Sequence, residues 1–344
     1  MTRGFQSIHP KQYTEIEPAT ATMLFMSEPL NAIVNPAAQD AIQIAFEASD
    51  LGDIEEITGL FLGYANINYR VKTTTGSYLA RFCRAQPVER IHDEILFLGS
   101  IQESGFPAAY PIARKDGGFI SHHQQEKVMV YIFVDGAPPE VSADSARQVG
   151  QALGCLSLKP VPAEYSSTSL IAIEDLRQFR IEKSTELEQY PEFRTEFLEQ
   201  TRFIETHLPF DLPRGLVHAD AFPDNTIFRN GKLVALIDFE DSCVDALIFD
   251  VGMAIIGFGY RDEALEQELV SALLEGYQSH RVLSEAERNA LPEMALWCAH
   301  GMAFWHLRHY LENPNDRQKQ RIGELQRMVR GLRGSDGEKI RGCF

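Results

Sequence analysis

A β-hairpin pattern interrupts the second half of this sequence, whose periodicity is otherwise mostly helical. Residues 215–240 read GLVHADAFPDNTIFRNGKLVALIDFE, with two short apolar runs joined by RNGK. An Asn-Gly pair between apolar runs is a strong hairpin signal, because both residues tolerate the positive φ of a two-residue turn. The polar stretch HADAFPDN before the hairpin predicts a loop. The fold must therefore place a polar loop and a hairpin within a helical body.

The first third of the chain has a different pattern, rich in strands. Helical spacing of apolar residues predicts a helix over 35–50, which begins at an Asn-Pro pair. Alternating residues over 57–84 predict successive antiparallel strands, broken at Gly63 and at a Thr-Thr-Gly turn. A second helix is predicted over 87–105 and a buried strand over 127–136.

These patterns divide the chain into three parts. Residues 1–34 show no sustained period and are interpreted as an N-terminal extension. Residues 35–134 form a small antiparallel-sheet N-lobe with one key helix, and residues 135–344 form a larger, mostly helical C-lobe with the loop and hairpin. The predicted fold class is α+β with two lobes.

Composition excludes several classes of protein. The net charge is −17 over 344 residues and no run is rich in Lys or Arg, so nucleic acid is not an expected partner. The five cysteines are scattered without a CxxC pair, which indicates neither a disulfide framework nor a structural zinc site. No long apolar segment predicts a signal peptide or membrane span. We expect a protein of the reducing cytoplasm.

The loop and hairpin carry residues suited to phosphoryl transfer. Asp220 is expected in the loop, Asn225 at the start of the first strand and Asp238 at the end of its partner. Hairpin pairing would bring Asn225 and Asp238 together, and these two side chains supply the oxygen ligands that Mg²⁺ prefers. Asp220 would remain available to accept a proton from an attacking hydroxyl.

The segments HADAFPDNTIF, LIDFED and DALIFDVGMAI resemble the aminoglycoside and choline phosphotransferase family, which has a protein-kinase-like fold. Within that family, GLVHADAFPDN and LLEGYQSHRVLSEAERNALP are most similar to homoserine kinases. The resemblance covers about residues 37–330. It implies a kinase that uses ATP and Mg²⁺ to phosphorylate a hydroxyl of a small molecule, with L-homoserine as the first choice of acceptor.

The resemblance also implies roles for individual residues. Asp220 matches the catalytic base and His218 a residue that shapes its loop, while Asn225 and Asp238 match the Mg²⁺ ligands. Asp250 matches a buried Asp that ties the loop to the following helix.

On the ATP side, the resemblance implies that Gly63 opens the turn over the phosphates, and Asn68 lies where homoserine kinases have a similar Asn-x-Asn-Tyr. It also implies Arg81 as the phosphate-binding cation with Glu94 as its helix partner, and backbone groups from Ile132 to Val134 as contacts to adenine. Two positions depart from the family pattern. Arg81 stands where many relatives carry Lys, and Ser157 where they commonly have His.

Other polar residues have two interpretations each. Glu240, Asp241 and Asp245 would attract a substrate ammonium group or form a solvated acidic loop. Arg308 and Arg261 would hold a substrate carboxylate or form surface ion pairs.

The histidines of residues 300–309 have HxxH spacing, which can indicate a metal, but their apolar neighbours favour a core or interface helix. Three rival functions remain open. They are a kinase for another hydroxylated amine or sugar (choline, ethanolamine, methylthioribose, an amino sugar or an aminoglycoside), an inactive nucleotide-binding regulator, and a metal-dependent hydrolase that uses His218, Asp220 and Asp238 as ligands.

Overall fold

The computed structural model describes residues 34–60, 66–84, 86–208 and 211–344. The chain divides into two compact units, the first made of residues up to 91 together with 109–134, and the second of residues 92–108 together with 135–344. The chain passes from the first unit to the second after residue 134, which is where the predicted lobe boundary lies. Residues 92–108, which lie inside the predicted N-lobe, group with the larger unit.

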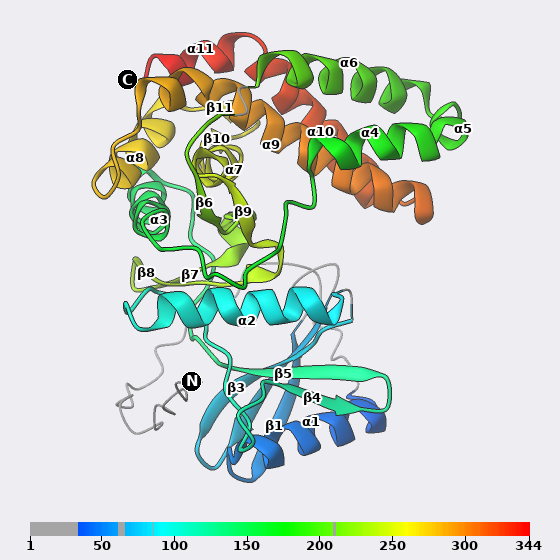
Figure 1. Cartoon of the computed structure of the whole chain (residues 1–344), viewed down its shortest axis with the longest axis vertical. Helices are drawn as coiled ribbons and strands as arrows, with labels where there is room; N and C mark the ends of the chain where they lie inside the picture. The colour runs from blue at the N-terminus through cyan, green and yellow to red at the C-terminus, as the bar shows by residue number, and fades with distance from the viewer. Residues whose placement is uncertain (1–33, 61–65, 85, 209–210) are drawn as a thin grey trace. The chain divides into compact units, whose positions relative to one another are not determined.

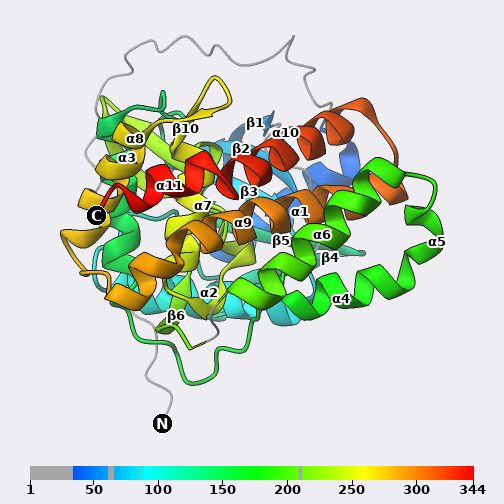
Figure 2. The same ribbon diagram turned by 90° about the horizontal axis from the view of Figure 1, so that it is seen from above.

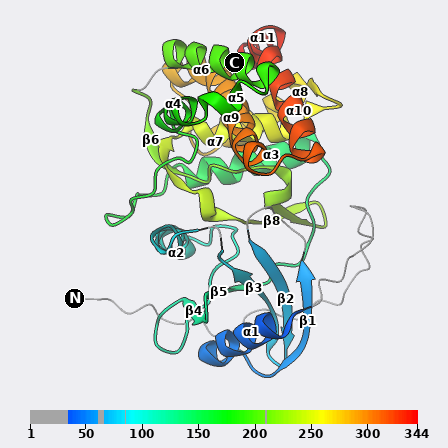
Figure 3. The same ribbon diagram turned by 90° about the vertical axis from the view of Figure 1, so that its right-hand side faces the viewer.

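The first unit is built on a five-stranded antiparallel sheet (Figure 1, Figure 3). Its strands, in the spatial order β1-β2-β3-β5-β4, are β1 Ile54–Leu60, β2 Ile67–Thr73, β3 Gly76–Phe82, β5 Glu126–Ile132 and β4 Ile120–His123. Thr73 pairs with Gly76, so the Thr-Thr-Gly turn closes a tight hairpin as predicted. The pattern had not indicated β4, whose four residues are too few for an alternating signal.

Helix α1, Pro36–Ser49, packs on this sheet and completes the core of the first unit. The side chain of Asn35 accepts a 2.7 Å hydrogen bond from the N–H of Ala38, which confirms the predicted helix start. The buried face of the helix meets Val71, Ala80 and other sheet residues. The apolar residues of that face are Ala38, Ala41, Ile42, Ala45 and Phe46.

The second unit is mostly helical. Helix α2, Val88–Gln102, crosses the unit boundary between Ile91 and His92. Helices α6 and α10 pack along the long helix α9 (Figure 2), which begins at the predicted capping box of Ser284 and Glu287. The helices after α2 are α3 Ala143–Leu156, α4 Ile173–Glu182, α5 Ser184–Leu187, α6 Pro191–His207, α7 Ile248–Phe258, α8 Gln267–Gln278, α9 Glu285–Glu312, α10 Asp316–Leu332 and α11 Ser335–Arg341.

Helices α3 and α8 approach so closely that glycines are required at their contact. A Cβ added at Gly150 would lie 2.1 Å from the carbonyl oxygen of Leu273, and one at Gly276 would lie 2.0 Å from that of Arg147. Both distances are far inside van der Waals contact. The glycines therefore allow the two helix backbones to touch.

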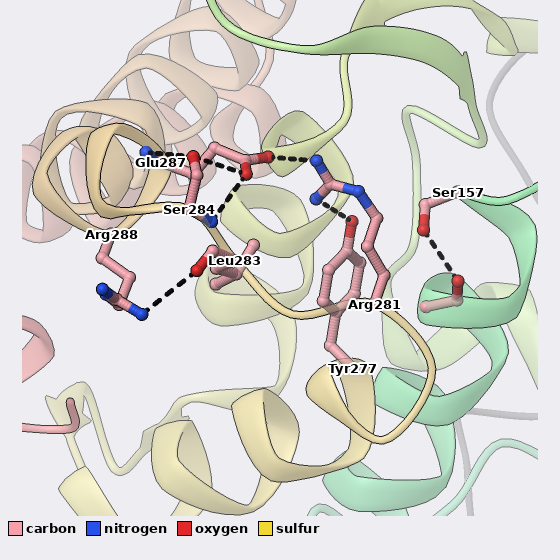
Figure 4. A network of polar contacts seen from close by, with 8 residues as sticks. Ser157, Tyr277, Arg281, Leu283, Ser284, Glu287 and Arg288 are labelled. Carbon is pink, nitrogen blue, oxygen red and sulfur yellow. Dashed lines mark hydrogen bonds and ion pairs between the residues drawn. The ribbon is translucent and has the colours of Figure 1, made fainter.

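A buried polar network joins the end of α8 to the start of α9 (Figure 4). One carboxylate oxygen of Glu287 accepts from the N–H and hydroxyl of Ser284, both at 2.9 Å, and the other oxygen pairs with Arg281 at 2.7 Å. Arg281 also donates to the hydroxyl of Tyr277 at 3.3 Å. The Glu287 charge, which is 1% exposed, is thus compensated on both oxygens.

The predicted hairpin is present as β7, Thr226–Arg229, and β8, Lys232–Leu236. Its turn residues Asn230 and Gly231 have φ values of 52° and 71°, which confirms a two-residue turn with positive φ. The sequence pattern missed the pairing of β6, Arg214–Val217, with β9, Cys243–Ala246, and the short pair β10, Tyr260–Arg261, with β11, Ala264–Leu265. No helix within the described ranges combines the length and apolar character that a membrane crossing requires.

Candidate active site

The polar loop lies between β6 and β7 and is hydrogen-bonded to α7. Asp250, in the first turn of α7, accepts hydrogen bonds from the backbone N–H groups of His218 (2.9 Å) and Ala219 (2.8 Å). Ala219 has a φ of 68°, a region that residues other than Gly rarely adopt. The buried Asp250 carboxylate therefore holds the loop in a strained conformation, and it makes the tie to the following helix that the resemblance implies.

His218 is buried and connects the loop to the end of the hairpin. Its Nε2 lies 3.0 Å from the carbonyl oxygen of Ile237 and therefore carries the proton, while Nδ1 accepts from the N–H of Asp220 at 3.3 Å. The ring packs against Phe239 with 4.5 Å between centroids. Burial lowers the pKa of His218 to about 4. A neutral imidazole at pH 7 thus sets the spacing between the loop and the hairpin.

Asp220 and Asn225 are in direct contact. The side-chain Nδ2 of Asn225 donates to Oδ2 of Asp220 at 2.5 Å and to the Asp220 backbone carbonyl at 2.9 Å. The N–H of Phe222 donates to the same carbonyl at 2.9 Å. These bonds orient the half-buried Asp220 carboxylate and fix the side-chain oxygen of Asn225 beside it.

The hairpin returns the chain from Asn225 to Asp238. Thr226 is opposite Leu236 in the strand register, and the N–H of Ile237 donates to the carbonyl of Asn225 at 3.0 Å. Asp238 follows with a φ of 66° and turns the chain into the short 3-10 segment η3, Phe239–Asp241. Strand pairing therefore places Asn225 beside Ile237, the residue that precedes Asp238.

Several carboxylates gather at this point. Burial raises the pKa of Asp220 well above its ordinary value, and the charges of Asp241, Asp238 and Asp224 raise it further, against a lowering contribution from the Asn225 amide. Across the described ranges no three or more His, Cys, Asp or Glu side chains are grouped to bind a metal. Mg²⁺ usually takes only one or two carboxylates and completes its shell with phosphate and water oxygens. The acidic donor set fits that mode of binding.

Of the predicted ATP-side residues of the first unit, Asn68, Arg81 and Ile132 lie on its sheet, and Val134 follows the end of β5. Gly63 is outside the described residues. Asn68 on β2 is directly opposite Arg81 on β3, so both side chains are on one face, and both are buried. The Arg81 guanidinium carbon lies 5.5 Å from the ring centroid of Tyr131 on the neighbouring strand.

The predicted hinge strand already uses some of its backbone groups. The N–H of Ile132 donates to the carbonyl of Tyr110 at 3.0 Å, and the N–H of Phe133 to that of Ser77 at 3.4 Å. Any contact from this segment to adenine would therefore use other backbone groups between Ile132 and Val134.

The remaining predicted residues lie in the second unit. Glu94 is on α2 and is 2% exposed, while Glu240 and Asp241 are the last two residues of η3. The Arg308 guanidinium carbon lies 5.8 Å from the Phe304 ring on its own helix. The other candidates have these partners: Arg261 with Glu266 (2.8 Å), Asp245 with Arg214 (3.2 Å), His300 with Thr201 (3.0 Å), His306 with Gln318 (2.7 Å) and His309 with the Trp305 carbonyl (2.8 Å).

Sequence patterns missed some residues that surround this site. Asp93 on α2 accepts hydrogen bonds from Ser166 and Ser167, and Ser242 after η3 contacts Tyr165. These partners are 73 to 77 positions apart in sequence. No local periodicity or spacing could have indicated contacts of that range.

Solved structures with a similar fold are kinases and phosphotransferases. The amicoumacin kinase hAmiN, solved with AMP-PNP, Ca²⁺ and amicoumacin, is 15% identical with a TM-score of 0.64, and the match covers 84% of this chain and 93% of that one. An ethanolamine kinase of Plasmodium vivax is 14% identical with a TM-score of 0.58, covering 83% of each chain. These likenesses define a kinase-like fold, with a small antiparallel-sheet unit and a larger helical unit.

The family follows from the sequence comparisons. Residues 56–288 match the model of the phosphotransferase enzyme family, and the chain belongs to that family, as its motifs predicted. It is a phosphotransferase that acts on a hydroxyl group. The homoserine kinase of Agrobacterium fabrum is 30% identical over 271 residues, which cover 76% of this chain and 82% of that protein. The homoserine kinase of Gluconobacter oxydans is 27% identical, covering 83% and 92%.

Proposed function

We propose that this phosphotransferase is a kinase that transfers the γ-phosphoryl group of ATP to the hydroxyl of L-homoserine, with Mg²⁺ as the metal. The observation that carries the proposal is the contact of the Asp220 carboxylate with Asn225, at the end of a hairpin that returns the chain to Ile237, the residue before Asp238. Phosphoryl transfer requires a group that orients the acceptor hydroxyl and a separate site for the metal.

In this proposal Asp220 accepts the proton of the acceptor hydroxyl. A carboxylate with a raised pKa accepts a proton more readily than an ordinary one, and burial among like charges raises the pKa of Asp220. The Asn225 amide keeps the carboxylate oriented. His218 and Asp250 hold the loop that carries it.

Asn225 and Asp238 would hold the metal through their side-chain oxygens, with Asp241 as a nearby negative charge. When bound, Mg²⁺ supplies neutralisation of the charge that develops on the phosphates. The crowding of Asp220, Asp238 and Asp241 supports a cation here, since their mutual repulsion raises the pKa of Asp220.

The first unit supplies the ATP-binding groups in this proposal. They are Arg81 and Asn68 on one face of the sheet, Gly63, which precedes β2 in the sequence, and backbone groups from Ile132 to Val134. Glu94 on α2 is proposed as the partner of Arg81, as the resemblance implies. Arg cannot lose its charge at physiological pH, so it keeps the electrostatic role of a Lys at this position.

Homoserine is proposed as the acceptor because relatives named homoserine kinase match most of the chain at 27 to 30% identity. Its ammonium group would approach Glu240 and Asp241, and its carboxylate would approach Arg308. A kinase for ethanolamine, choline or an amino sugar is the alternative, since ethanolamine and antibiotic kinases share the fold. Five free thiols support a reducing, cytoplasmic location.

A coupled ADP-release screen over homoserine, choline, ethanolamine, methylthioribose, amino sugars and aminoglycosides tests the proposal. We expect homoserine to give the highest kcat/KM. Another acceptor as the best substrate would correct the substrate alone. Product without ATP would establish a hydrolase, and ATP binding without turnover of any acceptor would establish an inactive regulator.

Asp220→Ala tests the role of the base. Loss of a general base costs about 10² to 10⁴ in rate, and we expect ATP to bind with nearly unchanged affinity. The matched control is Asp224→Ala, which removes an exposed carboxylate from the same loop and should retain most of the activity. Equal losses in the two variants would contradict the role of Asp220.

A further inference from the structure

A short segment of the second unit, residues 165–167, is hydrogen-bonded to α2 on one side. Oδ2 of Asp93 on α2 accepts from the hydroxyl of Ser167 at 2.7 Å, and from the hydroxyl and N–H of Ser166 at 3.1 and 3.3 Å. Asp93 is 6% exposed. Three donors on one buried carboxylate oxygen compensate the charge and make charge-assisted bonds. The segment is therefore held firmly to the helix that carries Glu94.

The same segment is hydrogen-bonded on its other side to the chain that follows Asp238. The hydroxyls of Tyr165 and Ser242 lie 3.1 Å apart, and Ser242 directly follows η3. The N–H of Val244 donates to the carbonyl of Ser167 at 3.3 Å. Ser242 is 2% exposed, so its contact is inside the protein. Residues 165–167 thus touch both α2 and the η3 loop.

Aromatic side chains fill the space between these two attachments. Phe97 lies one turn after Asp93 on α2, so the two share a face of the helix. Its ring centroid is 6.0 Å from that of Tyr165 and 5.3 Å from that of Phe239, the residue after Asp238. Phe239 in turn packs against His218. Helix α2, the 165–167 segment and the η3 loop therefore form one continuous packed cluster.

We propose that Asp93, Tyr165, Ser167 and Ser242 are positioning residues that set the placement of the Asp238–Asp241 loop relative to the turn of α2 that carries Glu94. The inference rests on the proposed function, because it assigns Asp238 to the metal and Glu94 to the ATP side. Metal ligands lose affinity when the groups that orient them are removed, and such changes typically cost about 10- to 100-fold.

A structural role alone would predict a different result. If these contacts only stabilised the fold, their removal would lower the melting temperature and leave the Mg²⁺ requirement of the folded enzyme unchanged. If they position the loop, the Mg²⁺ concentration for half-maximal rate should rise by about tenfold or more, while the KM of the acceptor stays the same.

The test uses the full chain with Tyr165→Phe, Ser242→Ala and their combination. Tyr165→Phe removes only the hydroxyl and keeps the ring against Phe97, so we expect it to fold. Both changes break the same hydrogen bond, the one between the Tyr165 and Ser242 hydroxyls. The double variant should therefore require little more Mg²⁺ than either single variant. The matched control is Ser169→Ala. The Ser169 hydroxyl accepts a hydrogen bond from the N–H of Ile171, two positions further along the chain, and its removal should leave the Mg²⁺ requirement unchanged.

Two further readouts do not depend on turnover. Calorimetric binding of AMP-PNP with Mg²⁺ should weaken in Tyr165→Phe and not in Ser169→Ala, and amide exchange of residues 238–246 should be faster in Tyr165→Phe even without nucleotide. The inference would be overturned if Tyr165→Phe and Ser242→Ala had the same Mg²⁺ dependence and the same amide exchange as the wild type. Failure of the wild type to phosphorylate any acceptor would instead overturn the proposed function, and the exchange measurement would still decide the role of the segment.

Discussion

The carboxylate of Asp250 accepts a 2.8 Å hydrogen bond from the N–H of Ala219, which is held at a φ of 68° directly before Asp220. The left-handed conformation costs an L residue about 1–2 kcal/mol. The second bond of Asp250, to the N–H of His218, helps to offset that cost. The orientation of the proposed base therefore depends on a carboxylate 30 positions further along the chain.

Asp250→Asn should disturb this anchor. The amide of Asn has one oxygen in place of two, so one loop N–H would lose its acceptor. An unsatisfied buried donor costs about 1–3 kcal/mol, and we expect the free energy of unfolding in urea to fall by that amount and kcat to fall with it. The control is Asp211→Asn, an exposed carboxylate that should change neither quantity. Unchanged unfolding in Asp250→Asn would contradict the role of the anchor.

Acid should destabilise the protein through its buried histidines. Burial lowers the pKa of His300 to about 3, below the value of about 6.5 expected in the unfolded chain. The unfolded state therefore binds more protons between those limits, and stability falls as pH falls from about 6.5 toward 3. One such group contributes a slope of at most about 1.4 kcal/mol per pH unit.

His300→Gln keeps a polar group beside Thr201 and removes the titration. Urea unfolding at several pH values should show a flatter acid dependence in this variant than in the wild type, whereas exposed His280→Gln should follow the wild type. His218 contributes in the same direction, since its pKa is lowered to about 4. Asp250 has a pKa raised to about 7, so its effect on stability at acid pH is opposite to that of the two histidines. The acid dependence of each variant must therefore be compared with that of the wild type. Parallel curves for His300→Gln and the wild type would refute the prediction.

Substitution by Ala should have opposite effects on stability at Gly150, in the tight contact of α3 with α8, and at Gly323, on an open face of α10. Gly150→Ala would place a methyl group 2.1 Å from the carbonyl oxygen of Leu273, and overpacking of this kind costs about 1–3 kcal/mol. Gly323→Ala in α10 meets only an Arg side-chain atom at 3.7 Å and should stabilise the helix by about 0.5–1 kcal/mol. Thermal unfolding measures both, and a destabilised Gly323→Ala together with a neutral Gly150→Ala would contradict the packing argument.

The buried pair of Arg281 and Glu287 should contribute far more than an exposed pair (Figure 4). Arg281→Met leaves the Glu287 charge with fewer partners, and breaking a buried pair costs about 3 kcal/mol or more. Arg281→Met combined with Glu287→Gln should recover part of that loss. Arg261→Met, which breaks an exposed pair with Glu266, should cost less than about 1 kcal/mol. Equal losses for Arg281→Met and Arg261→Met in urea unfolding would refute the distinction.

Much of the candidate site could be predicted from local sequence because its main elements are local. The Asn-Gly turn sets the register of β7 and β8, and the register brings the chain at Ile237 back to Asn225. The helix starts at Asn35 and Ser284 were equally predictable, since a cap uses residues only three positions apart. Strands β6 and β9 gave no such signal, because each has four residues and its partner lies far along the chain.

The sequence by itself determined the chemistry available to this protein: the residue types, their order around the hairpin and the family to which the motifs belong. Only the tertiary structure decided which partners surround that chemistry. Three sets of hydrogen bonds join distant segments: those of Asp250 with the loop N–H groups, that of the His218 Nε2–H with Ile237, and those of Asp93 with Ser166 and Ser167. Periodicity and spacing describe neighbours along the chain, whereas hydrogen bonds and burial depend on neighbours in space.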